Sequence, residues 1–200
     1  DPVAAVDLIE KEKITIIGLV PTIARMLMPE IEKRAAAVKS ARLIVATGEA
    51  FPIEIKKRLA VTAPNIGLYT FYAQTEAGFI TGLRPEEQAT HPESCGRPIP
   101  AVEVRIVDQD LNEVPRGDVG EITCRCGTPG VMSMPEYWRN PEATAAAFHE
   151  GWLRTGDLGA ANNNNRPFVR HFIVLNVCTI IYQDRLGTNM KRKTEIKGCL

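Results

Sequence analysis

The sequence lacks the features that suit an extended charged partner or a membrane. Its 24 lysine and arginine residues balance its 24 aspartate and glutamate residues, so the formal net charge is +0. Without a net field, we expect partners to be recognised at local sites, and we expect no binding to nucleic acid. The longest apolar runs are far shorter than the roughly 20 residues that span a bilayer, and no signal-peptide pattern opens the chain. We therefore expect neither secretion nor a transmembrane segment.

Cysteine and histidine are too few and too scattered for several kinds of site. The spacing of Cys124 and Cys126 is not that of a zinc knuckle. The five cysteines, an odd number, form no disulfide framework, so we expect reduced thiols and a cytoplasmic protein. No histidine has a serine or cysteine arranged with it as a triad. The cysteines are Cys95, Cys124, Cys126, Cys178 and Cys199, and the histidines are His91, His149 and His171.

An initiator methionine is also absent, because the chain opens with Asp1 and Pro2. Asp1 is a good helix N-cap, Pro2 fits the first helical position, and apolar residues follow at helical spacing to about Lys13. We expect a helix here, and we interpret residue 1 as a truncation point within a longer chain. With 200 residues, 44% of them hydrophobic, the sequence can form one domain or a fragment of a larger one.

The first half of the sequence alternates short β-branched runs with helical patterns. Strands are predicted at 14–20, 42–47 and 66–70, and helices at 21–39 and 52–60. This βαβαβ order predicts a parallel sheet. Ligands of such sheets bind beyond the carboxyl ends of the strands. Two loops qualify as binding loops, residues 48–52 and 71–78.

After residue 98 the pattern changes to that of an antiparallel β subdomain. Residues 102–107 and 120–126 alternate between apolar and polar side chains, and a short helix is predicted to follow Asn140. Trp138 and Trp152 are expected to pack in the core of this subdomain.

We thus predict an α/β fold. A partial α/β portion occupies residues 1–98, a β-rich subdomain occupies residues 99–159, and residues 160–200 form a diverged or disordered tail. The tail begins with an asparagine run and shows no clear caps.

One loop carries groups that suit a nucleotide, in the order Tyr72-Ala73-Gln74-Thr75-Glu76. A purine can stack on Tyr72, Thr75 can donate a hydrogen bond to a phosphate oxygen, and Glu76 can bind Mg²⁺, which prefers carboxylate and phosphate oxygens. The same residues would also suit a capped helix start, with Glu76 in its first turn. The loop alone leaves both interpretations open.

Two further motifs join this loop in a specific order. Gly48-Glu49-Ala50-Phe51-Pro52 precedes it, and Arg154-Thr155-Gly156-Asp157-Leu158 follows it. Together the three resemble the motifs of adenylate-forming enzymes, the family of acyl- and aryl-CoA synthetases, luciferases and peptide-synthetase adenylation domains. Ala73 stands where that family usually has glycine. The resemblance covers roughly residues 1–159, and the ordered combination is far more specific than any one motif.

The resemblance implies a two-step ligase that uses ATP, Mg²⁺ and CoA. A carboxylic acid would attack the α-phosphate of ATP to give acyl-AMP and pyrophosphate, and the CoA thiol would then displace AMP. The resemblance implies that Tyr72 packs on adenine, Thr75 contacts the α-phosphate, Glu76 binds Mg²⁺ and Asp157 accepts hydrogen bonds from the ribose. Further nucleotide contacts are implied for Gly48, Glu49, Ala50, Phe71, Ala73 and Gln74.

Three points of this reading have alternatives. Asp157 after Gly156 would also suit an ordinary turn. Val20 and Thr22, with Ala73, are candidates for the acyl pocket, although Pro21 between the first two is equally typical of a helix start. The acceptor could be a carrier protein in place of CoA.

The sequence departs from the family pattern at both ends. The family's glycine-rich phosphate loop would lie before residue 1, and its catalytic lysine would come later than residue 200. Arg185 faintly resembles the family's hinge arginine, which contacts ribose. We therefore expect a ligase fragment that is inactive alone, with a non-catalytic remnant as the alternative.

Overall fold

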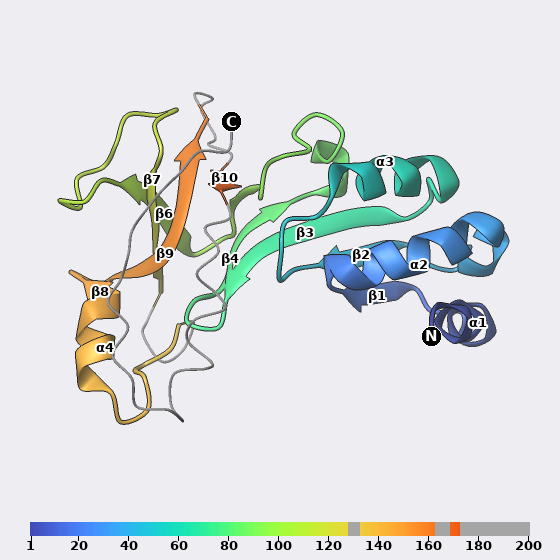
Figure 1. The fold of residues 1–200 in the computed structure, drawn as a ribbon, viewed down its shortest axis with the longest axis horizontal. Helices are drawn as coiled ribbons and strands as arrows, with labels where there is room; N and C mark the ends of the chain where they lie inside the picture. The colour runs from blue at the N-terminus through green and yellow to red at the C-terminus, as the bar shows by residue number, and fades with distance from the viewer. Residues whose placement is uncertain (128–132, 163–168, 173–200) are drawn as a thin grey trace, which may run out of the picture.

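The computed structural model describes residues 1–127 and 133–162, together with the backbone of residues 169–172. These described residues form two β-sheets of five strands each, with helices against the first (Figure 1). Sheet A has the order β1-β2-β3-β4-β5, and sheet B has the order β10-β9-β7-β6 with β8 paired to β9. The predicted α/β class is confirmed, since sheet A contains parallel strands and sheet B is antiparallel.

The first five predicted elements form in the predicted order. They are α1 (Pro2–Glu12), β1 (Ile16–Leu19), α2 (Pro21–Lys33), β2 (Leu43–Ala46) and α3 (Ile53–Thr62). Asp1 caps α1 by accepting a hydrogen bond from the Val3 N–H at 2.9 Å. Helix α2 ends six residues before the predicted Lys39, because Arg34 leaves the helical conformation and a 3₁₀ turn, η1 (Ala35–Val38), follows.

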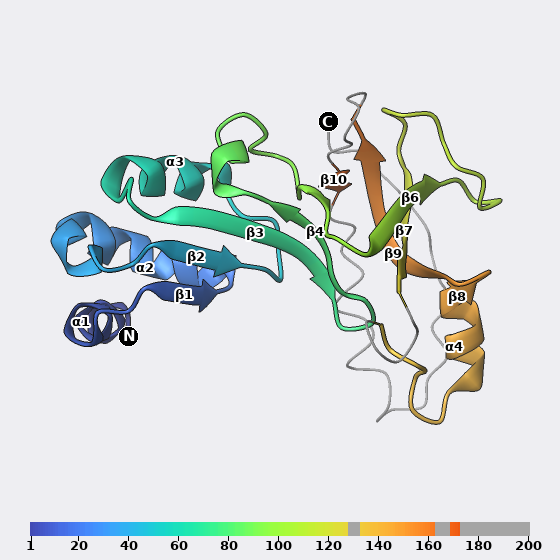
Figure 2. The ribbon, with the colours of Figure 1, turned by 180° about the vertical axis from the view of Figure 1, so that it is seen from behind.

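Strand β3 (Gly67–Gln74) ends four residues beyond its predicted end at residue 70, and a strand that we did not predict, β4 (Gly78–Leu83), pairs with it antiparallel. Much of the supposed loop 71–78 is therefore strand. A short 3₁₀ turn, η2 (Pro85–Glu87), leads to β5 (Arg97–Pro98) at the edge of sheet A. The long β3–β4 hairpin extends from the helical layer towards sheet B (Figure 2).

Sheet B contains the strands predicted from alternation and several more. Its members are β6 (Val102–Val107), β7 (Gly120–Cys126), β8 (Phe148–His149), β9 (Trp152–Ala161) and β10 (Val169–Phe172). Helix α4 (Pro141–Ala147) begins after Asn140, whose side chain caps it as predicted. Regular structure continues past residue 160, because β9 runs to Ala161 and pairs with β10. Trp138 was wrongly assigned to the core, since it is 81% exposed.

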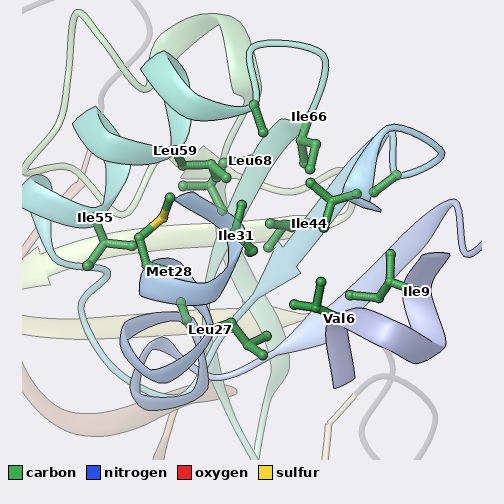
Figure 3. Close-up of a cluster of buried hydrophobic side chains, with 14 of the residues drawn as sticks. Val6, Ile9, Leu27, Met28, Ile31, Ile44, Ile55, Leu59, Ile66 and Leu68 are labelled. Atoms are coloured by element: carbon green, nitrogen blue, oxygen red, sulfur yellow. The ribbon is translucent and has the colours of Figure 1, made fainter. Parts of the chain in front are cut away.

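Two hydrophobic cores hold the sheets. In the first, α1, α2 and α3 pack their apolar faces against one face of sheet A (Figure 3). Its members include Val6, Ile9, Leu27, Met28, Ile31, Ile44, Ile55, Leu59 and Leu68. The second core lies against sheet B and includes Tyr72, Ile80, Ile122, Cys124 and Leu153. Because Tyr72 and Ile80 come from β3 and β4, the hairpin is shared between the two sheets and fixes sheet B to sheet A.

Lys56 is an unusual member of the α3 face, because it is 8% exposed. Its Nζ donates a hydrogen bond to the Pro92 carbonyl at 2.7 Å. Burial lowers the pKa of Lys56 from 10.5 to about 8. Between these two pH values the unfolded chain binds more protons at this group than the folded chain, so the contribution of Lys56 to folding stability rises with pH there.

We expect Lys56→Met to remove this pH dependence. The unfolding free energy of the wild type, relative to the variant, should rise by about 2–3 kcal/mol between pH 8 and pH 10.5 and should be flat below pH 8. Urea unfolding at a series of pH values measures this difference. Lys57→Met, at the exposed neighbouring position, is the control and should show no such rise. If the unfolding free energies of the wild type and Lys56→Met change with pH in the same way, the lowered pKa of Lys56 is wrong.

Candidate functional site

The motif residues Thr75 and Glu76 lie in the tight turn between β3 and β4. The Ala77 N–H donates to the Gln74 carbonyl at 3.2 Å, and the strands change register between Tyr72 and Ala73. Such a bulge re-aims the side chains that follow it. The helix-start interpretation of Thr75 and Glu76 is therefore wrong. Thr75 is exposed and Glu76 is half-buried.

Asp157 receives two side chains from the other sheet. The Tyr72 hydroxyl donates to Asp157 Oδ2 at 2.7 Å, and Gln74 Nε2 donates to the same oxygen at 2.8 Å. Gln74 Nε2 also donates to the Thr155 carbonyl at 3.0 Å. Burial and the bond to Asp157 raise the pKa of Tyr72, so its phenol stays protonated and remains a donor. We call Tyr72, Gln74 and Asp157 the clasp.

The backbone around Asp157 is strand and not turn. Asp157 lies within β9, so the turn interpretation is wrong. Gly156 has a φ of 73°, a conformation that favours glycine, and it lies opposite a register shift in β7. Beside it, the Thr155 hydroxyl donates to the Ile122 carbonyl at 2.6 Å, which anchors β9 to β7. The motif is therefore a bulged strand that presents a carboxylate to sheet A.

Tyr72 is placed differently from a simple stacking platform. Its side chain is 7% exposed and packs in the second core. The neighbouring Phe71 lies on the opposite face of β3, stacked on Tyr69 at 4.4 Å between ring centroids and tilted against Phe79 at 4.6 Å. Ala73 is half-buried and pairs with Phe79. The Tyr72 hydroxyl is thus used in the hydrogen bond to Asp157, and only the ring of Tyr72 is left to contact a ligand.

Glu76 is hydrogen-bonded to Tyr137, a residue that has no predicted role. Its Oε1 accepts a hydrogen bond from the Tyr137 hydroxyl at 2.9 Å, and its backbone carbonyl accepts one from the Met134 N–H at 2.7 Å. Glu76 Oε2 has no hydrogen-bond partner among the residues that the structure describes. Burial, and then the bond to Glu76, raises the pKa of Tyr137 to about 12. No spacing in the sequence links positions 76 and 137.

The loop after β2 makes a second group with the start of α2. Gly48, Glu49 and Ala50 are exposed, and Gly48 has a φ of 103°. The Thr22 hydroxyl donates to Glu49 Oε1 at 2.7 Å. Val20 lies directly against Gly48, since a Cβ there would meet Val20 Cγ1 at 3.4 Å. Two of the three predicted acyl-pocket residues, Val20 and Thr22, are therefore neighbours of this predicted nucleotide loop.

Sheet A explains how these groups share one edge. In the parallel register Leu19 of β1 lies level with Ala46 of β2, and Ala46 lies level with Thr70 of β3. Val20 and Thr47 thus follow the carboxyl ends of their strands, while β3 continues over the same edge as Phe71 to Gln74. Loops at this edge form the ligand sites of parallel sheets. Arg185, the remaining candidate, lies outside the described residues.

Other kinds of site find no support in the described part of the chain. No three His, Cys, Asp or Glu side chains gather there as a metal cluster. Among the described residues, Cys95, Cys124 and Cys126 form no disulfide, while Cys178 and Cys199 lie outside the described residues. Among the described helices, none has the length and apolar character to cross a membrane.

The comparisons with known proteins agree on one family. The family model described as "AMP-binding enzyme" matches residues 1–138. The chain belongs to the AMP-binding enzyme family. Its relatives include indoleacetate–CoA ligase of Aromatoleum aromaticum, which is 33% identical over 160 residues, or 80% of this chain and 30% of that protein.

Solved structures give the same result. Amide bond synthetase McbA from Marinactinospora thermotolerans has a TM-score of 0.75 and 32% identity, covering 84% of this chain and 34% of that one. O-succinylbenzoate coenzyme A synthetase from Bacillus subtilis, solved with ATP and magnesium ion, has a TM-score of 0.74 and 26% identity, covering 86% and 34%. The chain spans about a third of the length of the curated relatives that it matches.

Proposed function

We propose that this chain forms part of a site that activates a carboxylic acid as acyl-AMP, using ATP, and passes the acyl group to CoA. The observation that carries the proposal is the clasp, in which Tyr72 and Gln74 of sheet A orient the Asp157 carboxylate of sheet B. An oriented carboxylate is a suitable acceptor for the paired hydroxyls of a ribose. The family match and the CoA ligases among the relatives support the same reaction.

Glu76 fits the role of a cation ligand. Its carboxylate is half-buried, one oxygen is held by Tyr137, and Oε2 has no partner among the described residues. Mg²⁺ prefers such hard oxygen ligands and is usually bound by one or two carboxylates together with phosphate oxygens. When bound, the ion would neutralise charge on the phosphates of ATP. The adjacent Thr75 hydroxyl, exposed in the same turn, would donate to the α-phosphate.

The remaining site residues take supporting roles in this proposal. Gly48, Glu49 and Ala50 would line the adenine together with Phe71 to Gln74, and the ring of Tyr72 would contact the base while its hydroxyl holds Asp157. Val20 and Thr22, beside the Gly48 loop, would line the acyl pocket with Ala73. Arg185 would contact the ribose. The described cysteines, which form no disulfide with one another, suit the reducing cytoplasm, where we place the protein.

The acyl acceptor is the part of the proposal for which a second candidate exists. The structure of McbA, an amide bond synthetase, is as similar in fold as the CoA synthetases. An amine or the thiol of a carrier protein could therefore replace CoA. A chimera in which residues 1–159 replace the matching segment of indoleacetate–CoA ligase is supplied with CoA, amine or carrier protein separately, and the release of AMP with each distinguishes the three acceptors. The proposal expects release with CoA.

We expect Asp157→Asn to weaken nucleotide binding. Loss of the charged acceptor should raise the dissociation constant for AMP about 10-fold or more, since hydrogen bonds to charged groups contribute about 1.5–3 kcal/mol. Isothermal titration of AMP into the 200-residue chain measures this. Asp118→Asn, at an exposed position just before β7, is the control and should leave the affinity for AMP unchanged. Equal affinity in Asp157→Asn and wild type would contradict the ribose role.

A further inference from the structure

A short segment, residues 134–140, directly precedes helix α4 and is hydrogen-bonded to the β3–β4 turn. We call this segment the strap. At the turn, the Met134 N–H donates to the Glu76 carbonyl at 2.7 Å. Towards α4, the Tyr137 N–H donates to Thr144 Oγ1 at 2.9 Å, and the Asn140 side chain caps the helix. The strap is therefore fixed at both ends, and Tyr137 lies between them.

Tyr137 contacts Glu76 in two complementary ways. Its hydroxyl donates to Glu76 Oε1, while the strap that carries it holds the Glu76 backbone. Side chain and main chain of Glu76 are thus both restrained. A glutamate side chain that is free to rotate loses rotamer entropy when a ligand fixes it. Here the contacts with Tyr137 and Met134 already restrict Glu76 in the folded chain, so less entropy is lost when a ligand binds.

The direction of this hydrogen bond matters for what Glu76 can bind. An ionised carboxylate accepts at two oxygens, and Tyr137 uses one of them. The other oxygen, Oε2, has no hydrogen-bond partner among the described residues. A hydroxyl that donates to a ligand's second oxygen fixes the ligand's orientation, and removing such a partner typically costs about 10–100-fold in metal affinity or activity.

We infer that Tyr137 is a positioning residue that orients the Glu76 carboxylate for a divalent cation bound with a nucleotide. The inference rests on the proposed function, because it requires Glu76 to be a cation ligand. The inference adds Tyr137 to the residues of the proposed cation site. Through the strap, the position of Glu76 then depends on the contacts between Tyr137 and α4. Tyr137 itself does not contact the cation.

Manganese binding tests the inference without an activity assay. The 200-residue chain is titrated with Mn²⁺ in the presence of ATP, and free Mn²⁺ is measured by electron paramagnetic resonance. Tyr137→Phe removes a single hydroxyl and should weaken Mn²⁺ binding about 10-fold or more. Tyr69→Phe is the matched control, because it also removes one phenol hydroxyl. The ring of Tyr69 stacks on Phe71, on the face of β3 opposite Tyr72, so this variant should bind Mn²⁺ as the wild type does. Thermal unfolding of each variant shows that it is folded.

The outcomes separate the inference from the proposed function. Weak binding by Glu76→Gln, with Tyr137→Phe within twofold of the wild type, would overturn the inference and leave the role of Glu76 intact. Unchanged binding by Glu76→Gln, or no binding by the unaltered chain, would overturn both. If Tyr137→Phe does not fold, Thr144→Val carries the test, because it releases the strap and leaves the phenol. It should weaken Mn²⁺ binding to a smaller extent, and unchanged affinity would again contradict the inference.

Discussion

Replacing Glu76 with glutamine should reduce carboxylate-dependent ATP–pyrophosphate exchange by about a hundredfold or more. A neutral amide keeps the shape of the side chain and can still accept from Tyr137, but it is a poor ligand for Mg²⁺. Charge stabilisation by such an ion contributes several kcal/mol to the transition state, and each 1.4 kcal/mol corresponds to about a factor of ten in rate. The assay uses a chimera in which residues 1–159 replace the matching segment of indoleacetate–CoA ligase.

The control for this prediction is Glu103→Gln. Glu103 is an exposed residue of β6 that pairs with Arg125 at 2.7 Å, so its loss also removes one carboxylate and one ion pair. Exposed ion pairs contribute about 1 kcal/mol or less, and the exchange rate should be unchanged. A Glu76→Gln chimera that exchanges as fast as the Glu103→Gln chimera would show that Glu76 is not a metal ligand.

The second large effect is expected at Gly96, before β5. Its φ is 96°, and an added Cβ would lie 2.0 Å from the backbone carbonyl carbon and oxygen of Gly82 in β4. Backbone atoms within a sheet cannot move aside as a flexible side chain can. Gly96→Ala should therefore destabilise the chain by more than about 3 kcal/mol, combining backbone strain with a steric clash. Urea unfolding measures the loss.

Gly151→Ala isolates the conformational part of that effect. Gly151 has a φ of 81°, and an added Cβ would meet nothing within 4 Å. Only the left-handed conformation should then contribute, at about 1–2 kcal/mol. If the two variants lose the same stability, the close approach of Gly96 to Gly82 does not constrain the sheet.

The sequence predicts the helical layer of the fold well and the β3–β4 hairpin poorly. Residues 1–70 follow simple periodicity, because each element there has one apolar face and packs into one core. Residues 71–78 carry turn-forming and polar groups, which resemble a loop when taken in isolation. Gly82 further weakens the signal of β4. The structure accommodates it because the rings of Tyr69 and Phe71 lie over Gly82, where a Cβ would meet them at 2.7 and 3.0 Å.

The candidate site shows a similar division. Residue types within each motif indicate nucleotide chemistry, and the motifs lie on the elements that bring them to one edge of sheet A. Contacts between residues far apart in the chain could not be predicted from the sequence, because 85 positions separate Tyr72 from Asp157 and 61 separate Glu76 from Tyr137. Pairing of that kind depends on how the two sheets meet, which no local pattern encodes. Trp138 was misplaced for the same reason, since its size predicts burial whereas the strap exposes it.

Exchange of labelled pyrophosphate into ATP tests most directly whether the clasp and Glu76 belong to an acid-activating site. The chimera carrying residues 1–159 is assayed with a panel of fatty and aryl carboxylic acids. Our account predicts exchange that requires one of these acids and that falls sharply in both Asp157→Asn and Glu76→Gln. Exchange that proceeds equally without acid, or that survives both substitutions, would contradict it.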